Sequence, residues 1–406
     1  MQENKTVTSE LVTMLRYPLI VSVVVHHCFF WVSGWHYNQL SEQSIGSNVV
    51  SELILSSRIL ISSVVPIFFL ISGYFFFVHL KNWDTKVWKR KMKRRVWTLL
   101  IPYILWNTLF FLHQISPEIP RIIHGNSWEI INSWVNNHGG WLGMYWNGRI
   151  ISQETVDIWG LPTQTNVPIL LPFYFIRNLM VVTLFTPLLH FLLRARNKSV
   201  TTCAAVTIGL LLFLHLSKTS FILSGFSAEA FFFFGLGAFL SLNGFELSEA
   251  FYAKRKVIAF VYLSLFFIEL FFGFQSSNIG KILHPLYAVF EAMTVVNCAS
   301  WLVKKSPANK RLSALKNALT RWQHSSFMIY ALHFFLIVSV RSFFNKVIGA
   351  TTGYNGISAM GLSTHYPYLV LIIFLTKIVI IVSICMIVSI LLERFFPRFN
   401  KILCGR

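Results

Sequence analysis

The stretch MLRYPLIVSVVVHHCFF, residues 14–30, is almost entirely apolar, yet it contains Arg16, His26 and His27. A long apolar run of this kind predicts a helix that crosses a membrane, for which about 20 apolar residues are needed. Charged and titratable side chains inside lipid are costly and mark functional positions. The stretch therefore predicts a membrane-spanning fold with a site in its first helix.

The composition of the whole chain supports a membrane fold. Of its 406 residues, 55% are hydrophobic and 12% are charged, whereas about 25% of the residues of a soluble domain are charged. A soluble fold of this length has no interior for so many apolar side chains. We therefore predict an all-α, polytopic bundle of transmembrane helices that forms a single domain over residues 1–406.

The positions of the basic residues predict the topology. The formal net charge is +20, and lysines and arginines gather in short runs between apolar stretches, at 86–95, 194–198, 254–256, 304–311 and 394–406. Such runs are typical of cytoplasmic loops under the positive-inside rule. The charge is therefore a topology signal and not a sign of nucleic-acid binding, with some attraction to anionic membrane lipids.

About ten stretches are long and apolar enough to be spans, at 11–33, 53–79, 96–113, 169–193, 199–217, 226–243, 257–274, 284–303, 325–346 and 368–392. With the basic runs inside, both termini lie in the cytoplasm. The extended external segment 114–168 is rich in Trp, Asn and Gly. We expect it to be either a lid that binds an acceptor or a loop whose aromatic rings lie among lipid headgroups.

The first span offers two groups for chemistry. On a helix His27 lies roughly 16 Å deeper in the membrane than Arg16, and a neutral imidazole there can take a proton from a hydroxyl as a general base. Imidazole is also a competent nucleophile. Arg16 can hold a phosphate-bearing donor. The plainer alternative is a histidine that packs between helices and an arginine that snorkels.

Six stretches resemble those of one family, in family order: LRYPLIVSVVVHH (15–27), VPIFFLISGYFFF (65–77), KRRVWTLLIPYILWN (93–107), LPFYFIRNLMVV (171–182), SFMIYALH (326–333) and FPRFNKILCGR (396–406). They are similar to the acyltransferase-3 group of integral membrane O-acyltransferases. The family's opening arginine and histidine fall on Arg16 and His27, which favours His27 over its neighbour His26. Two residues depart from the family pattern: Tyr174 replaces a Trp, and Asn178 replaces the Asp after Arg177.

The resemblance implies transfer of an acyl group, expected to be acetyl, from cytoplasmic acyl-CoA to a hydroxyl of a cell-envelope sugar or glycolipid. It also implies a multi-pass protein of the bacterial cytoplasmic membrane, with Arg16 and His27 as its catalytic residues. Since CoA is strongly anionic, Arg90, Arg94 and Arg95 are candidates to bind its phosphates. These arginines can equally be stop signals for membrane insertion.

Five further residues are candidates to bind substrate: Ser72, Tyr74, Arg177, Tyr330 and His333. Gly73, between the first two, permits a close approach of helix backbones. Tyr330 and His333 share a helical face because they are three residues apart, and we expect them either to lie beside His27 or to make structural hydrogen bonds.

Buried acids and cysteines complete the candidates. Glu229 and Glu291 are candidates to pair with Arg58 or Arg177, since charges in lipid pair inside the bundle, but one sequence does not assign the partners. The five cysteines are far apart and show no CxxC spacing, so we expect neither a disulfide framework nor a metal site.

Two other functions compete with acyl transfer of this type. The first is a transporter or flippase for a lipid-linked sugar or small solute, which inverted internal repeats would favour; we find none in the sequence. The second is a different membrane acyltransferase fold that uses His333 with Asn107, which leaves the pattern of the first span unexplained. An oligomer is compatible with either function.

Overall fold

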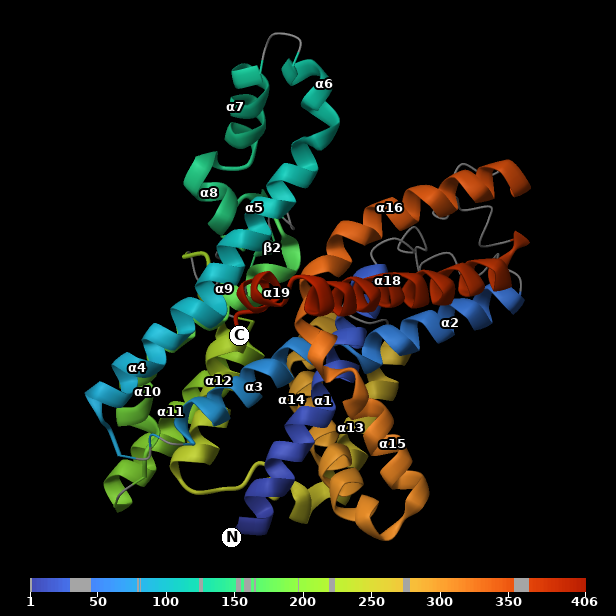
Figure 1. Cartoon of the computed structure of the whole chain (residues 1–406). Helices are drawn as coiled ribbons and strands as arrows, with labels where there is room; N and C mark the ends of the chain where they lie inside the picture. The colour runs from blue at the N-terminus through green and yellow to red at the C-terminus, as the bar shows by residue number, and fades with distance from the viewer. Residues whose placement is uncertain are drawn as a thin grey trace. The chain divides into compact units, whose positions relative to one another are not determined.

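A computed structural model describes residues 2–29, 45–78, 80, 82–123, 127–150, 155–156, 162–163, 166–195, 197–218, 223–272, 278–353 and 365–406. In this part the chain is almost entirely helical, which confirms the predicted all-α class. The chain forms two compact units (Figure 1). The first comprises Met1–Val65 with Glu246–Leu391, and the second comprises Pro66–Phe245 with Leu392–Arg406. The single domain over residues 1–406 stays a prediction.

The first unit is a bundle of long helices. Its helices are α1 (Gln2–Phe29), α2 (Ile45–Leu60), α13 (Arg255–Phe272), α14 (Asn278–Lys305), α15 (Lys310–Arg321), α16 (Ser326–Thr352) and α18 (Pro367–Phe395), with 3-10 turns at Tyr252–Lys254, Ser306–Ala308 and Gln323–Ser325. Helix α1 packs against α14, α15 and α16, and α13 packs against α14 and α2. Ile59, Leu265 and Tyr287 form a buried apolar cluster where α2, α13 and α14 meet.

The second unit contains most of α3 (Val64–Phe77) and ten further helices. These are α4 (Thr85–Arg95), α5 (Ile101–Ile115), α6 (Ile119–Arg121), α7 (Ser127–Asn137), α8 (Gly140–Trp146), α9 (Tyr174–Leu184), α10 (Thr186–Leu193), α11 (Lys198–Leu216), α12 (Ala228–Leu242) and α19 (Pro397–Leu403). A π-helical turn at Val96–Leu100 joins α4 to α5, and 3-10 turns lie at Ser116–Glu118 and Leu171–Phe173. Helix α19 packs on α5, where the Trp106 indole donates to the carbonyl oxygen of Leu403 at 3.0 Å.

The segment 114–168, predicted as an extended loop, contains the 3-10 turn Ser116–Glu118, helices α6, α7 and α8, and four two-residue strands. Strand β1 (Arg149–Ile150) pairs antiparallel with β4 (Asn166–Val167), and β2 (Thr155–Val156) pairs antiparallel with β3 (Pro162–Thr163). Residues 124–126, 151–154, 157–161 and 164–165 of the segment lie outside the described residues.

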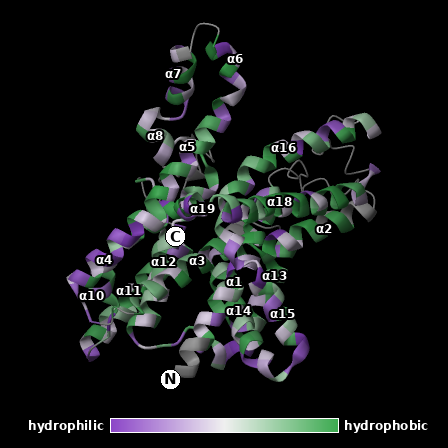
Figure 2. Ribbon diagram, viewed as in Figure 1, coloured by the Kyte–Doolittle hydropathy of each residue, from purple (hydrophilic) through white to green (hydrophobic). Residues whose placement is uncertain are grey.

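Each of the ten predicted spans coincides with a helix or a helix pair. Among the described residues, seven helices are long and apolar enough to cross a membrane, and α9 with α10 makes an eighth if this pair, bent by 61°, is one span. The other two are α12, which has 15 residues, and α13, which carries three charged side chains. In Figure 2, α18 is apolar along most of its length, whereas α4 is hydrophilic. The count of ten and the cytoplasmic termini stay predictions.

Two glycines let α3 and α12 approach each other closely within the second unit. A Cβ atom added at Gly73 would lie 2.0 Å from the carbonyl oxygen of Phe234, and one added at Gly237 would lie 2.0 Å from that of Leu70. Both distances are far below van der Waals contact, so the backbones touch where only glycine fits. The close approach predicted at Gly73 is therefore confirmed.

Candidate functional site

Two buried histidines meet inside the first unit. His27 lies near the C-terminal end of α1 and His333 lies on α16, which packs along α1. Their ring centroids are 5.3 Å apart, with the ring planes inclined by 36°. The exposed fractions are 5% for His27 and 0% for His333. The Tyr330 ring is 6.4 Å from that of His333, so the structure brings together three of the residues predicted to act.

A hydrogen bond defines the tautomer of His333. Its Nδ1 lies 3.0 Å from the carbonyl oxygen of Ile329, one helical turn earlier. Because a carbonyl only accepts, Nδ1 carries the proton and donates it. The other ring nitrogen, Nε2, then has a lone pair in the neutral ring. Nε2 is buried and has no hydrogen-bond partner in the described part of the chain.

The geometry separates His27 from its neighbour. The His26 ring is 5.7 Å from that of His27 and nearly perpendicular to it, and His26 is only half-buried. The His27 ring contacts His333 and also lies 5.8 Å from the Phe334 ring. Adjacent residues on a helix point about 100° apart, which explains why one of the two faces α16. This arrangement favours His27, as the sequence pattern does.

Arg16 lies on α1 as well, and its side chain is exposed. Eleven residues correspond to three helical turns and about 20°, so Arg16 and His27 lie on one face of α1, roughly 16 Å apart along its axis. At that separation the guanidinium does not reach the His27 ring. The arrangement suits contact with a distant part of a long donor molecule, not with the reacting atoms.

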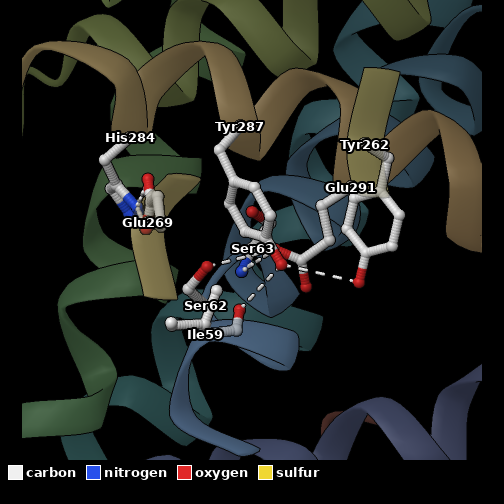
Figure 3. Close-up of polar contacts among 8 residues, drawn as sticks. All are labelled: Ile59, Ser62, Ser63, Tyr262, Glu269, His284, Tyr287 and Glu291. Carbon is white, nitrogen blue, oxygen red and sulfur yellow. Dashed lines mark hydrogen bonds and ion pairs between the residues drawn. The ribbon is translucent and has the colours of Figure 1, made fainter. Parts of the chain in front are cut away.

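The second predicted span is interrupted between two helices, and a cluster of polar side chains bonds to the backbone at this break (Figure 3). Helix α2 ends at Leu60 and α3 begins at Val64. One carboxylate oxygen of Glu291 accepts from the Ser63 amide and from the Ser62 hydroxyl, each at 3.1 Å. The Tyr287 hydroxyl donates to the carbonyl oxygen of Ile59 at 3.1 Å. Side chains one turn apart on α14 thus satisfy backbone groups on both sides of the break, as an apolar environment requires.

The sequence did not identify the partners of the acids in this cluster. Glu291 was a candidate to pair with Arg58 or Arg177, and the structure shows that it accepts hydrogen bonds from the two serines that precede α3. Glu269, fully buried, lies 3.1 Å from Nδ1 of His284. An acid inside an apolar run signalled that a partner exists, but no residue pattern identified which one.

We expect Glu291→Leu to lower the thermal stability of the purified protein. The change leaves the buried Ser63 amide and the Ser62 hydroxyl without their acceptor, at about 1–3 kcal/mol for each such group. Glu291→Gln keeps an acceptor oxygen, so its loss of thermal stability should be much smaller. Melting temperatures in detergent measure this, with Ser62→Ala as the control that removes only the hydroxyl bond. Equal melting of the Leu and Gln variants would contradict the capping role.

The basic helix α4 belongs to the second unit. Asp84 caps it by accepting from the amides of Lys86 and Val87. Arg90 and Arg94 are exposed, whereas Arg95 is half-buried, with its guanidinium 5.8 Å from the Phe76 ring. Lys91 donates to the carbonyl oxygen of Phe76 and lies over the same ring. The three predicted phosphate-binding residues of α4 therefore divide into two exposed arginines and one that packs against an aromatic side chain.

Arg177 is buried in the second unit, where it is held by neutral acceptors. Its Nε and Nη2 atoms both donate to Oδ1 of Asn178 at 3.2 Å, and Nη1 donates to the carbonyl oxygen of Trp146 at 2.5 Å. An asparagine therefore keeps the hydrogen bonds that an aspartate at this position would make, without its charge. The arrangement fixes the guanidinium next to the Trp146 ring, 5.8 Å away.

Three other residues named from the sequence are also in the second unit. Ser72 is half-buried and Tyr74 is buried, both on α3. The Asn107 amide donates to the carbonyl oxygen of Tyr103 at 2.8 Å and accepts from the Leu170 amide at 3.2 Å. Because both ends of this amide bind backbone groups, the structure gives Asn107 a structural role and offers no support for a catalytic pair with His333.

Comparison with known proteins identifies one relationship. Residues 12–394 match a family model described as an acyltransferase domain. The matched range covers nearly the whole chain and includes both histidines of the pair, Arg16, Arg177 and the basic helix α4. No curated protein and no solved structure matches the chain.

Proposed function

The chain belongs to the acyltransferase-3 family of membrane acyltransferases, and from this premise we propose that it transfers an acyl group from cytoplasmic acyl-CoA to a hydroxyl of a cell-envelope sugar or glycolipid. The observation that supports this most directly is the buried contact between His27 and His333. Family membership favours an enzyme over the transporter or flippase considered from the sequence. We place the protein in the bacterial cytoplasmic membrane and take acetyl as the acyl group.

In this proposal His27 acts as the general base. A ring nitrogen of His27 takes the proton of the acceptor hydroxyl while the oxygen attacks the thioester carbonyl carbon. The tetrahedral intermediate collapses, the C–S bond breaks, and the proton passes from His27 to the thiolate of CoA. A positioned base of this kind contributes about 10²–10⁴-fold to the rate. The low exposure of His27 keeps water, the competing acceptor, away from the thioester.

The donor is held through its phosphates. Arg16, and the exposed Arg90 and Arg94 of α4, carry guanidinium groups of the kind that make charge-assisted hydrogen bonds to phosphates. Arg95, which packs on Phe76, contributes positive charge from a fixed position. Cytoplasmic acyl-CoA has to reach a base within the membrane, and its long pantetheine arm suits a wide separation between phosphates and thioester.

The acceptor is a sugar in this proposal. Trp128 and Trp141 of α7 and α8 stack on each other at 6.2 Å between ring centroids, and their exposed fractions are 63% and 45%. Exposed indole faces of this kind bind sugar rings, although they also suit lipid headgroups. We assign the hydroxyls of Ser72, Tyr74 and Tyr330 and the Arg177 guanidinium to substrate binding, the role for which the sequence made them candidates.

Two measurements test the function. Mass spectrometry of cell-envelope glycans from strains with and without the gene should show an acyl group that depends on the gene. Membranes containing the protein should transfer label from radiolabelled acetyl-CoA to the same glycan. Identical glycans in the two strains, together with no transfer from acetyl-, succinyl- or longer acyl-CoA, would rule the proposal out.

Arg16→Ala should weaken use of the donor. Loss of a hydrogen bond to a charged group costs about 1.5–3 kcal/mol, which corresponds to a KM for acyl-CoA raised by about 10- to 150-fold. The kcat at saturating donor should fall much less, because Arg16 lies far from the His27 ring. Initial rates over a range of acyl-CoA concentrations measure both parameters.

Arg311→Ala is the matched control for Arg16→Ala, since it removes an exposed arginine of the same unit. Its KM for acyl-CoA should stay at the wild-type value. An unchanged KM in Arg16→Ala, or an equal rise in both variants, would show that Arg16 does not bind the donor phosphates.

A further inference from the structure

His333 presents a buried lone pair beside the candidate base. Its Nδ1 is committed to the carbonyl oxygen of Ile329, and its Nε2 has no hydrogen-bond partner among the described residues. The side chain is completely buried, so bulk water does not satisfy this atom. A buried acceptor without a partner is unfavourable by about 1–3 kcal/mol. A fold that keeps one next to a reactive ring calls for an explanation beyond packing.

The neighbours of His333 limit what its Nε2 atom can accept. Three rings lie around it: His27 at 5.3 Å, Tyr330 at 6.4 Å and Phe334 at 6.4 Å between centroids. Phe334 has no polar hydrogen. His27 is the closest ring and carries an N–H on one of its two nitrogens in the neutral form. Joining that N–H to the lone pair of His333 requires the two rings, which are inclined by 36°, to reorient.

We propose that His333 is the positioning residue of the His27 base. Its Nε2 lone pair accepts the N–H of His27, which leaves the lone pair of the opposite nitrogen directed to the acceptor hydroxyl. This inference rests on the proposed function and deepens it, because it replaces the substrate-binding role expected for His333 with a role that acts through His27.

The same contact stabilises the charge that forms during the reaction. When His27 takes the proton of the acceptor, it becomes a cation in an apolar interior, where an unpaired charge is strongly disfavoured. Its other N–H then donates a charge-assisted bond to Nε2 of His333, about twice as strong as a neutral one. His333 remains neutral throughout, and the proton on His27 leaves with the CoA thiolate. The bond from Nδ1 to the α16 backbone holds the His333 ring in place for both steps.

Two isosteric variants separate this role from a structural one. In His333→Asn the side-chain amide takes the place of Nδ1, so it keeps the bond to Ile329 and removes the acceptor at Nε2. In His333→Gln the amide oxygen takes the place of Nε2, so it keeps the acceptor and removes the bond to Ile329. The proposal predicts that the Gln variant is the more active, whereas a purely structural anchor predicts that the Asn variant is.

The experiment measures kcat and KM for acetyl-CoA and for the acceptor glycan in the full-length wild-type protein and both variants. We expect kcat of His333→Asn to fall by about 10- to 100-fold, a part of the roughly 10²–10⁴-fold that a positioned base contributes, with both KM values unchanged. His333→Gln should keep most of kcat. Melting temperatures are recorded for each variant, so that a loss of folded protein is not read as a loss of rate.

The outcomes distinguish the inference from the function on which it rests. A wild-type protein that transfers no acyl group overturns both. With an active wild type, a His333→Asn variant of normal kcat, or one more active than His333→Gln, overturns the positioning role alone. A raised KM for the acceptor with normal kcat does the same, since it returns His333 to substrate binding.

Discussion

The His27→Ala variant is expected to insert and accumulate normally but to lose acyl transfer by about 10²–10⁴-fold, the usual contribution of a positioned general base. Alanine keeps α1 apolar and helical, so the span itself is retained. The change removes the His27 imidazole, the ring on the first span that lies against His333. Transfer of label from radiolabelled acetyl-CoA, normalised to the amount of protein in the membrane, measures the loss.

His26→Ala is the matched control for this prediction. It removes an imidazole from the adjacent position of the same helix, but from a ring that is half-buried and nearly perpendicular to that of His27. This variant should keep most of its activity. If His26→Ala is inactive while His27→Ala is active, the base is His26, and the eleven-residue spacing from Arg16 has no mechanistic meaning.

The membrane fold could be predicted because its signal is local. Each span is a continuous apolar run, and the basic runs between them mark the turns, so every predicted span coincides with a helix or a helix pair. Span number is harder to predict, because α12 is short and the bent pair α9–α10 reads as one run. The break between α2 and α3 was also not predicted, since Ser62 and Ser63 are compatible with an uninterrupted helix and become a break only where Glu291 and Tyr287 reach them.

The candidate site could be predicted only in part, because its residues are remote in sequence. Arg16 and His27 share one helix, so their spacing alone relates them. His333 lies on another helix, and only the packing of α1 on α16 brings its ring to that of His27. The role of its two nitrogens depends on one hydrogen bond to Ile329. Apolar residue patterns specify which face of a helix is buried. They do not specify which other helix packs against that face.

Substituting alanine for Gly73 is expected to destabilise the second unit strongly. The new methyl group would lie 2.0 Å from the carbonyl oxygen of Phe234 and 2.8 Å from its carbonyl carbon. These are backbone atoms of α12, so no side-chain rotation relieves the clash and the two helices have to separate. Forcing extra volume into a packed interior costs about 1–3 kcal/mol, and more where the backbone itself must move. The melting temperature in detergent and the amount of protein in the membrane measure the effect.

Gly209→Ala is the control, because a Cβ atom at this helical position of α11 meets nothing within 4 Å. There alanine should be neutral or stabilising, since it favours the helix over glycine by about 1 kcal/mol. Gly237→Ala should resemble Gly73→Ala, because it clashes with Leu70 across the same crossing. The double variant should then lose less stability than the two single losses added together, since one separation of α3 from α12 relieves both clashes. Fully additive losses would mean that the two glycines act at independent places, and that the crossing is not held by direct contact of the two backbones.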